Sequence, residues 1–225
     1  LARRKGAVEA RLKKEFGIES VKWVEFQFGP PMLEALGIGA IDIGPVGDTP
    51  PIFAQAAGAN VVYAISTPAA QHGILVRKDS ALKSIADLKG RKVAIPKGSS
   101  AHNFTVQALA ANGLSFADIE AVYLTPADGS AAFASGKVDA WAIWDPYYAL
   151  AEVKQNARAL DGGEKVKLSN SFYLANTDFA KKYPKVLKAV LDEYAALSAW
   201  TGDHRKEFAE VTTEATGLPI EATTR

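Results

Sequence analysis

The chain has 225 residues, of which 48% are hydrophobic and 23% charged, and its formal net charge is +1. This composition is typical of a globular protein with one large or two small domains, and the near-neutral charge argues against a nucleic acid or an anionic membrane as partner. The sequence contains no cysteine, which excludes a thiol nucleophile and a thiolate metal site, and it has no apolar run of the roughly 18 residues that a membrane span needs.

The first part of the chain is predicted to form helices and strands in alternation. Apolar residues at helical spacing, Val8, Leu12 and Phe16, predict a helix over 1–16 that closes at Gly17. Alternation over 21–28 predicts a strand. Further strands are predicted at 41–46, 61–65 and 74–76, with helices at 32–36 and 52–57.

A serine pair opens the helix that follows the next predicted strand. The apolar run Val93–Ile95 breaks at Pro96 and Gly98, and either Ser99 or Ser100 can cap the helix that ends at Asn112-Gly113. A strand, a glycine turn and a helix start form an anion cradle, because the free amides and the helix dipole point at the same place. The alternative is that the serines only cap a helix.

The alternation continues to the end of the chain. Asp128 is expected to cap a helix that ends at Gly136, and Asp145-Pro146 to start a helix after a β-type run. Strands that alternate with helices, without hairpin signals, predict parallel sheets built from βαβ units. The remaining strands are predicted at 122–124, 138–144 and 172–174, and the last helices at 184–200 and 205–215.

One pattern occurs twice. Gly39-Ala40-Ile41-Asp42 precedes Asp48 by six residues, and Gly136-Lys137-Val138-Asp139 precedes Asp145 by six. The repeat suggests two lobes with an equivalent unit in each. Ligands of open parallel sheets bind beyond the carboxyl ends of the strands, so two lobes that face each other there would form a cleft.

The chain resembles a known family in several stretches. EALGIGAIDIGPVGDTPPIFAQAAGA, SIADLKGRKVAIPKGSSAHN, YLTPADGSAAFASGKVDAWAIWDPYY and SFYLAN are similar to the substrate-binding components of aliphatic sulfonate ABC importers, over roughly residues 21–218. The resemblance implies a type II periplasmic-binding-protein fold of the α/β class, with two α/β lobes joined by two hinge segments. We expect residues 1–76 with 170–225 to form one lobe and residues 77–169 the other.

The resemblance also implies a function. A protein of this family captures alkanesulfonates in the cleft between its lobes and delivers them to an ABC transporter permease at the inner membrane for sulfur assimilation. Taurine, nitrate or another small organic anion is the alternative ligand. We expect a periplasmic monomer without cofactor or nucleic-acid partner, and a signal peptide that is not part of this chain, since no positively charged and then apolar leader opens it.

Two rival classes are disfavoured. A desulfinase that depends on a cysteine has the same fold. This chain has no cysteine, so we expect that the protein is not an enzyme. A ligand sensor with a DNA-binding half would need a helix-turn-helix segment that the sequence does not show. The three histidines have no metal-ligand spacing, and no G-x-S-x-G elbow occurs, so no catalytic or metal site is expected.

The sequence departs from the family pattern in two respects. Sulfonate-binding members commonly carry an arginine in the turn that here reads Ala127-Asp128-Gly129-Ser130, so an expected charge partner for the anion is absent. Members also usually begin with a further strand and continue beyond the segment at 217–219, so we expect both ends to be incomplete.

The candidate site residues lie at the predicted strand ends. Ser99 and Ser100 are the best anion contacts, and His102 is expected either to join them or to face solvent. Asp48 and Asp145 either cap helices or receive an amine or hydroxyl of the ligand, and of two strand tryptophans, Trp141 is expected in the core and Trp144 against an alkyl chain. The full set of ligand-contact candidates is Asp48, Thr49, Gly98, Ser99, Ser100, His102, Asn103, Asp128, Gly129, Ser130, Trp144 and Asp145.

Overall fold

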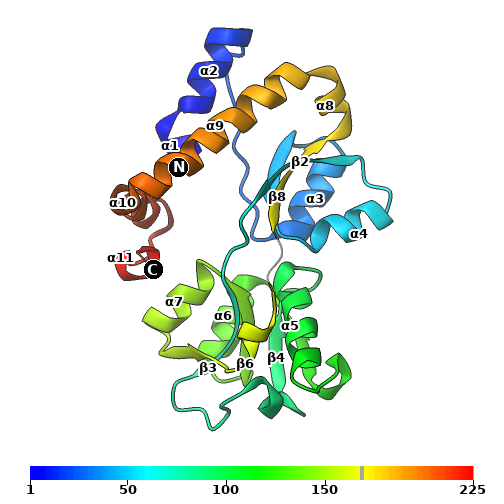
Figure 1. Cartoon of the computed structure of the whole chain (residues 1–225), viewed down its shortest axis with the longest axis vertical. Helices are drawn as coiled ribbons and strands as arrows, with labels where there is room; N and C mark the ends of the chain where they lie inside the picture. Colours follow the sequence, from blue (N-terminus) through cyan, green and yellow to red (C-terminus); the bar gives the residue numbers. More distant parts are fainter. Residues whose placement is uncertain (168–169, 225) are drawn as a thin grey trace.

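The computed structural model describes residues 1–167 and 170–224, and it contains two sheets that lie one beyond the other along the long axis (Figure 1). A three-stranded sheet has the order β1-β8-β2, and a five-stranded sheet has the order β5-β4-β6-β3-β7. Each sheet is covered by its own helices. We call the three-stranded sheet with its helices lobe 1 and the five-stranded sheet with its helices lobe 2.

Lobe 1 is built around strand β8, which lies between its two neighbours and runs antiparallel to both. Met32, Leu33 and Leu36 of one helix pack against Val46 and Leu174 of the sheet and form its core. The elements of this part are β1 (Ile43–Val46), β2 (Val61–Thr67), β8 (Ser171–Asn176), α3 (Gly29–Gly37), α4 (Pro50–Ala56) and α8 (Thr177–Lys182).

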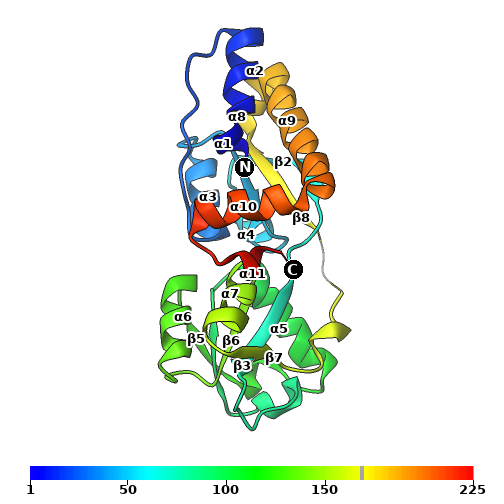
Figure 2. The same cartoon turned by 90° about the vertical axis from the view of Figure 1, so that its left-hand side faces the viewer.

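A layer of helices from both ends of the chain completes lobe 1. Val8 and Leu12 pack against Ala189 and Val190, which joins the first helices to the longest one (Figure 2). Arg11 lies on the same helix as Val8 and Leu12, and it forms ion pairs with Glu15, Asp192 and Glu193. These helices are α1 (Ala2–Lys5), α2 (Ala7–Phe16), α9 (Pro184–Asp203) and α10 (Arg205–Thr216). The last helix, α11 (Ile220–Thr223), contacts both α10 and α7 (Tyr147–Lys154) of lobe 2.

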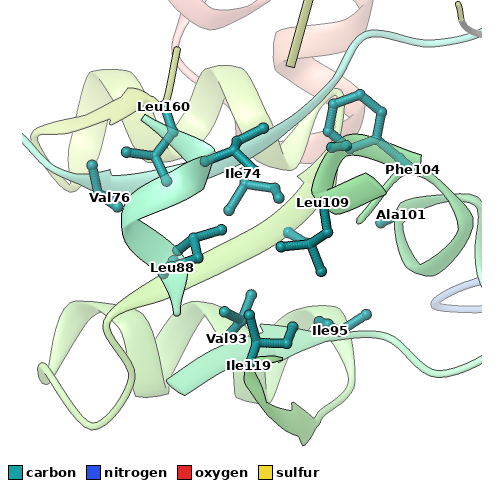
Figure 3. Close-up of a cluster of buried hydrophobic side chains, with 14 of the residues drawn as sticks. Ile74, Val76, Leu88, Val93, Ile95, Ala101, Phe104, Leu109, Ile119 and Leu160 are labelled. Carbon is teal, nitrogen blue, oxygen red and sulfur yellow. The ribbon is translucent and has the colours of Figure 1, made fainter. Parts of the chain in front are cut away.

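Lobe 2 carries a helix layer on each face of its sheet. On one face, Phe104 and Leu109 of the serine-capped helix pack with Ile74 and Ile95, as Figure 3 shows. On the other face, Trp141 packs with Phe133 and other residues. The elements are β3 (His72–Arg77), β4 (Lys92–Ile95), α5 (Ser100–Ala111), β5 (Glu120–Tyr123), α6 (Pro126–Ala134), β6 (Ala140–Trp144), α7 (Tyr147–Lys154) and β7 (Ala157–Ala159), with short 3-10 turns at Ile85–Leu88, Phe116–Asp118 and Gly163–Lys165.

The chain passes between the lobes in two places. The first passage joins β2 to β3 over residues 68–71, and the second returns to β8 and includes Asn170. The expected lobe boundary after Val76 falls within β3, which pairs with β6 and β7 of the five-stranded sheet. The division into domains by residue number stays a prediction.

The expectation of parallel sheets is correct only for the centre of lobe 2. Strand β4 runs parallel to β5 and β6, whereas β3 is antiparallel to β6 and β7. In lobe 1, β8 is antiparallel to both neighbours because it enters from the other lobe and so runs in the opposite direction. The pattern of alternating elements did not reveal this reversal, since it says nothing about long-range returns.

The predicted strand over 21–28 is wrong. The segment has no ladder pairing up to Phe26, although Trp23 and Phe26 pack against the hydrophobic clusters of lobe 1. An alternating pattern indicates a half-buried extended chain, but a strand also requires a neighbour that accepts its hydrogen bonds. The predicted helix over 1–16 is interrupted at Gly6, whose φ of 62° separates α1 from α2.

Two of the predicted caps are corrected. Thr125, not Asp128, is the N-cap of α6, and its hydroxyl accepts a hydrogen bond from the Asp128 amide. Pro146 occupies the N-cap position of α7, one residue after Asp145.

Among the described residues, no helix combines the length and the apolar composition that a membrane span needs.

Asn176 is predicted to be a stability determinant of lobe 1. Its buried side chain donates to the Leu36 carbonyl and accepts from the amides of Asp178 and Phe179. Asn176→Ala should lower the free energy of unfolding by about 1 to 3 kcal/mol, because it removes the N-cap of α8 and one buried hydrogen bond to the Leu36 carbonyl, which keeps its bond from the Gly39 amide. Urea denaturation measures the change.

Asn176→Ser is the matched variant, because a serine hydroxyl is also a good N-cap acceptor and lacks only the amide group that donates to Leu36. It should cost less than the alanine variant. Asn60→Ala, which removes an exposed hydrogen bond to Asp178, is the control and should change stability little. Equal losses for all three variants would contradict the role assigned to Asn176.

Candidate functional site

A pocket lies where the two lobes meet. Its lining comes from the loop after β1, from the start of β3, from one face of α5 and from the return passage to β8. Ser100, Asn103, Phe104 and Gln107 follow one another at the i, i+3, i+4, i+7 spacing of a single helix face. The lining residues are Gly47, Asp48, Ala69, His72, Ser100, Asn103, Phe104, Gln107, Val166, Asn170 and Ser171.

Gly47 allows the two lobes to meet. A Cβ atom on Gly47 would lie 2.8 Å from both Cβ and Oγ of Ser100, which is closer than carbon atoms approach in proteins. The backbone after β1 can therefore reach the start of α5 only without a side chain at this position. Gly98 has a φ of +71°, and a Cβ atom there would lie 3.8 Å from Cγ of Pro30.

Asp48 links the lobes through its hydrogen bond with Asn103. Its Oδ2 accepts from Nδ2 of Asn103 at 3.1 Å, and its Oδ1 accepts from the hydroxyl of Thr49 at 2.7 Å. Thr49 is the N-cap of α4, but no side-chain capping bond forms there. The structure thus brings together three of the predicted residues, Asp48, Thr49 and Asn103.

The two serines have different environments. Ser99 is the N-cap of α5 and is 2% exposed; its hydroxyl donates to the Pro96 carbonyl at 2.7 Å and accepts from the His102 amide. Its side chain is therefore occupied by the cap. Ser100 lines the pocket, where its Oγ lies 2.8 Å from Nε2 of His72. Of the pair, only Ser100 offers its hydroxyl to the pocket.

His72 is a pocket residue that the sequence analysis missed. Its Nδ1 lies 2.8 Å from the Ala70 carbonyl, and its ring lies 5.8 Å from the ring of Phe104 and 6.4 Å from that of Trp144. Burial lowers the pKa of His72, while the nearby carboxylates of Asp48 and Asp145 oppose that change. The spacing of the histidines carries no sign of this role, whereas a polar residue at the start of an apolar strand does.

His102 lies on the other side of α5. Its Nδ1 accepts a hydrogen bond from the Gly98 amide at 3.2 Å, and its ring lies beside those of Phe116 and Tyr123. At 3.6 residues per turn, a residue two positions after Ser100 projects nearly opposite to it. His102 is therefore not among the pocket-lining residues, and the Gly98 amide is occupied by His102.

The turn Asp128–Ser130 also lies away from the pocket, because α6 covers the sheet face opposite to α5. The Asp128 carboxylate accepts from the Thr125 hydroxyl at 2.8 Å, and the Ser130 hydroxyl accepts from Nε2 of Gln155 at 2.7 Å. A Cβ atom on Gly129 would lie 2.7 Å from Nε1 of Trp141. These three residues are not among those that line the pocket, and a contact between this turn and a ligand stays a prediction.

The end of β6 approaches the pocket through aromatic rings. Trp141 is 1% exposed, which confirms the expectation that it is a core residue. Trp144 is partly buried and stands beside His72 and, at 6.2 Å, the Tyr147 ring. Asp145 accepts from the Ala149 amide at 3.1 Å, so its carboxylate serves the first turn of α7.

The pocket presents neutral donors and one carboxylate. Within the described part of the chain, none of the residues that line it is lysine or arginine, and no group of three or more His, Asp or Glu side chains could hold a metal ion. The first turn of α5 adds amides and the positive end of the helix dipole. This arrangement suits an anion that accepts several hydrogen bonds.

Comparison with known proteins identifies the family to which the chain belongs. A family model described as NMT1/THI5 like matches residues 23–202. A relative from Escherichia coli (strain K12), whose name describes it as aliphatic sulfonates-binding, is 47% identical over 210 residues, which make up 92% of this chain. A relative from Bacillus subtilis (strain 168) with the same name is 37% identical over 214 residues, or 94% of the chain. The chain spans 66% and 64% of the lengths of these two proteins.

A solved structure supports the fold. The alkanesulfonate-binding protein SsuA from Xanthomonas axonopodis pv. citri, bound to MOPS, superposes with a TM-score of 0.91 and 40% identity. The match covers 99% of this chain and 76% of that protein. The predicted periplasmic-binding-protein fold of the α/β class is thereby confirmed.

The different environments of the two serines lead to a prediction on stability. Ser99→Ala should lower the free energy of unfolding by about 1 to 2 kcal/mol, because it removes the N-cap of α5 and a hydrogen bond to Pro96. Ser100→Ala should cost less, about 0.5 to 1 kcal/mol, since it removes only the hydrogen bond to His72 and no helix cap. Chemical denaturation of the two variants measures the difference, and a larger loss for Ser100→Ala would contradict the assignment.

Proposed function

Because the chain belongs to the NMT1/THI5-like family, we propose that it is the solute-binding component of an ABC importer and captures an alkanesulfonate in the pocket between its lobes. The observation that carries this proposal is that the pocket is lined from both lobes and is bridged by the hydrogen bond between Asn103 and Asp48. A ligand in this position would contact both lobes at once.

The sulfonate group would bind at the start of α5. The neutral donors available there are the Ser100 hydroxyl, the side-chain amide of Asn103 and the backbone amides of Ser100 and Ala101 at the N-terminus of α5. Neutral donors together with a helix dipole can hold an anion without a paired cation. The absence of an arginine from the turn at 127–130 is compatible with this mode, because that turn lies on the other face of the sheet.

The alkyl chain would lie against Phe104 and Trp144. Phe104 lines the pocket, and the ring of Trp144 is adjacent to that of His72. Burial of a methylene group contributes about 0.8 kcal/mol, so longer chains should bind more tightly until the aromatic surface is covered.

Contacts from both lobes would favour the closed state. A ligand shifts an equilibrium between open and closed forms only by its difference in affinity for the two. Donors on α5 and the loop after β1 would both be satisfied only when the lobes are together. The closed form is then the form that a membrane permease receives.

The remaining parts of the proposal follow from the family. The protein would act in the periplasm as a monomer, would release its ligand to a permease at the inner membrane and would thereby supply sulfur. Relatives that are named for binding rather than for a reaction support a role without catalysis. Residues 1–76 with 170–225 and residues 77–169 remain the proposed domains, apart from β3.

A second candidate ligand is taurine, a sulfonate with an ammonium group. The carboxylate of Asp48 lines the pocket, and the nearby negative charge of Asp145 acts to raise the pKa of His72. A carboxylate next to an anion site is favourable for a ligand that carries both charges and unfavourable for a plain anion. Nitrate and other small anions would lack both the ammonium group and the alkyl chain.

A thermal-shift series distinguishes these ligands. Ethane-, butane- and hexanesulfonate should raise the melting temperature in increasing order, and a ligand at 100 times its Kd should stabilise the folded form by about 2.7 kcal/mol. Buffers such as MOPS, HEPES and MES are themselves sulfonates and have to be avoided. A larger shift with taurine would favour the second candidate, and no shift with any sulfonate would contradict the proposal.

Gly47 provides a test of closure. The Cβ atom of Gly47→Ala would hold the loop after β1 away from Ser100, so sulfonate binding should weaken by about 1 to 3 kcal/mol. Isothermal titration calorimetry measures the loss. Gly202→Ala in α9 is the control, because a Cβ atom there has no neighbour within 4 Å. Unchanged affinity in Gly47→Ala would mean that this contact is not part of the ligand-bound form.

A further inference from the structure

The hydrogen bonds of His72 determine where its proton lies. Nδ1 lies 2.8 Å from the carbonyl oxygen of Ala70, which can only accept, so Nδ1 carries a proton. A neutral imidazole carries one proton, and Nε2 is then a bare acceptor. Since Nε2 lies 2.8 Å from Oγ of Ser100, the hydroxyl of Ser100 must donate to it.

This direction of the hydrogen bond is unfavourable for an anion. When Ser100 donates to His72, its only hydroxyl proton is occupied and its oxygen turns lone pairs toward the pocket. If His72 is protonated at Nε2, the ring donates instead, and Ser100 is free to donate its proton to a ligand. One proton on His72 therefore changes Ser100 from an acceptor into a donor.

The charges around His72 favour uptake of this proton when an anion arrives. The charged groups that face the ring are Asp48, from the loop after β1, and Asp145, at the end of β6. From α5 it meets Ser100 and Phe104, and from β6 it meets Trp144, none of which carries a charge. No lysine or arginine occurs among the described residues of the pocket lining, so a bound sulfonate would add negative charge beside a carboxylate.

We propose that His72 is a positioning residue that takes up one proton from solvent as a sulfonate binds, which reverses its hydrogen bond to Ser100 and makes that hydroxyl a donor to the ligand. The inference rests on the proposed function and names how the same pocket is regulated. The pocket then binds an anion together with a proton, and the affinity depends on pH although the ligand itself does not titrate.

The sign of the pH dependence follows from the two states of His72. Burial lowers its pKa in the ligand-free protein, so the ring is neutral near pH 7, and a bound anion raises the pKa. Affinity is then highest below the pKa of the free form, falls as the pH rises and becomes constant above the pKa of the bound form. One linked proton limits the slope to about tenfold per pH unit.

Calorimetric titration with sodium 1-butanesulfonate tests the proposal on the whole chain. Kd is measured from about pH 5.5 to 8.5 in buffers that contain no sulfonate, over the range in which histidine changes charge. Titrations at one pH in Bis-Tris and in Tris, whose ionisation enthalpies differ, report the protons taken up. We expect Kd to rise with pH and a net uptake of up to one proton.

His72→Gln should bind with an affinity that does not change with pH and without proton uptake, because an amide does not titrate. His204→Gln is the matched control, because Nδ1 of His204 also faces a carbonyl, that of Trp200, at the end of α9. It should keep the wild-type pH profile. Thermal denaturation verifies that both variants are folded.

Ser100→Ala separates the reversed hydrogen bond from simple charge attraction. The variant should lose more affinity at low pH than at high pH. Its Kd and that of the wild-type protein should therefore converge as the pH rises. This variant also keeps the test valid if His72→Gln does not fold.

Three results would overturn the inference: a Kd of the wild-type protein that is constant over this range, a pH profile that disappears in His102→Gln rather than in His72→Gln, or a full wild-type profile in Ser100→Ala. Failure of butanesulfonate to bind at every pH would instead contradict the proposed function itself.

Discussion

The close contact between Gly47 and Ser100 is the constraint on which the site depends. It brings the loop after β1 in lobe 1 within reach of the first turn of α5 in lobe 2, and the hydrogen bond from Asn103 to Asp48 holds the two together. A hydrogen bond of this kind is worth little by itself, because each partner could bond to water instead. A contact of this strength can be made and broken as a ligand enters and leaves.

The chemistry of the pocket is that of hydrogen bonding rather than of ion pairing. Donors come from Ser100, Asn103 and the start of α5, while the charged group that lines the pocket is a carboxylate. In a low-dielectric cleft, a carboxylate near an anion site is costly unless a proton or a ligand cation compensates for it. The position of His72 between Asp48, Asp145 and Ser100 offers such compensation within the site.

Local patterns predicted most elements but not their partners. The cap at Ser99, the helix after it and the buried strand before it follow from residue types alone and agree with the structure. The segment 21–28 has the pattern of a strand without the pairing, and β8 reverses the direction of lobe 1, because pairing depends on residues far away in the sequence. For the same reason no local pattern shows that the turn at Asp128–Ser130 lies on the sheet face opposite to α5.

The sequence by itself determined the α/β class, the family and the helix start that supplies the donors, since these depend on local propensity and on motifs of adjacent residues. The tertiary structure decided which side chains face the pocket. Ser99 and Ser100 are neighbours, yet one is buried in a cap and the other faces the opposite lobe. His72 lies 28 positions before Ser100 and meets it only because β3 packs beside α5. Distances between residues remote in sequence are set by how the two lobes pack, and no local pattern contains that information.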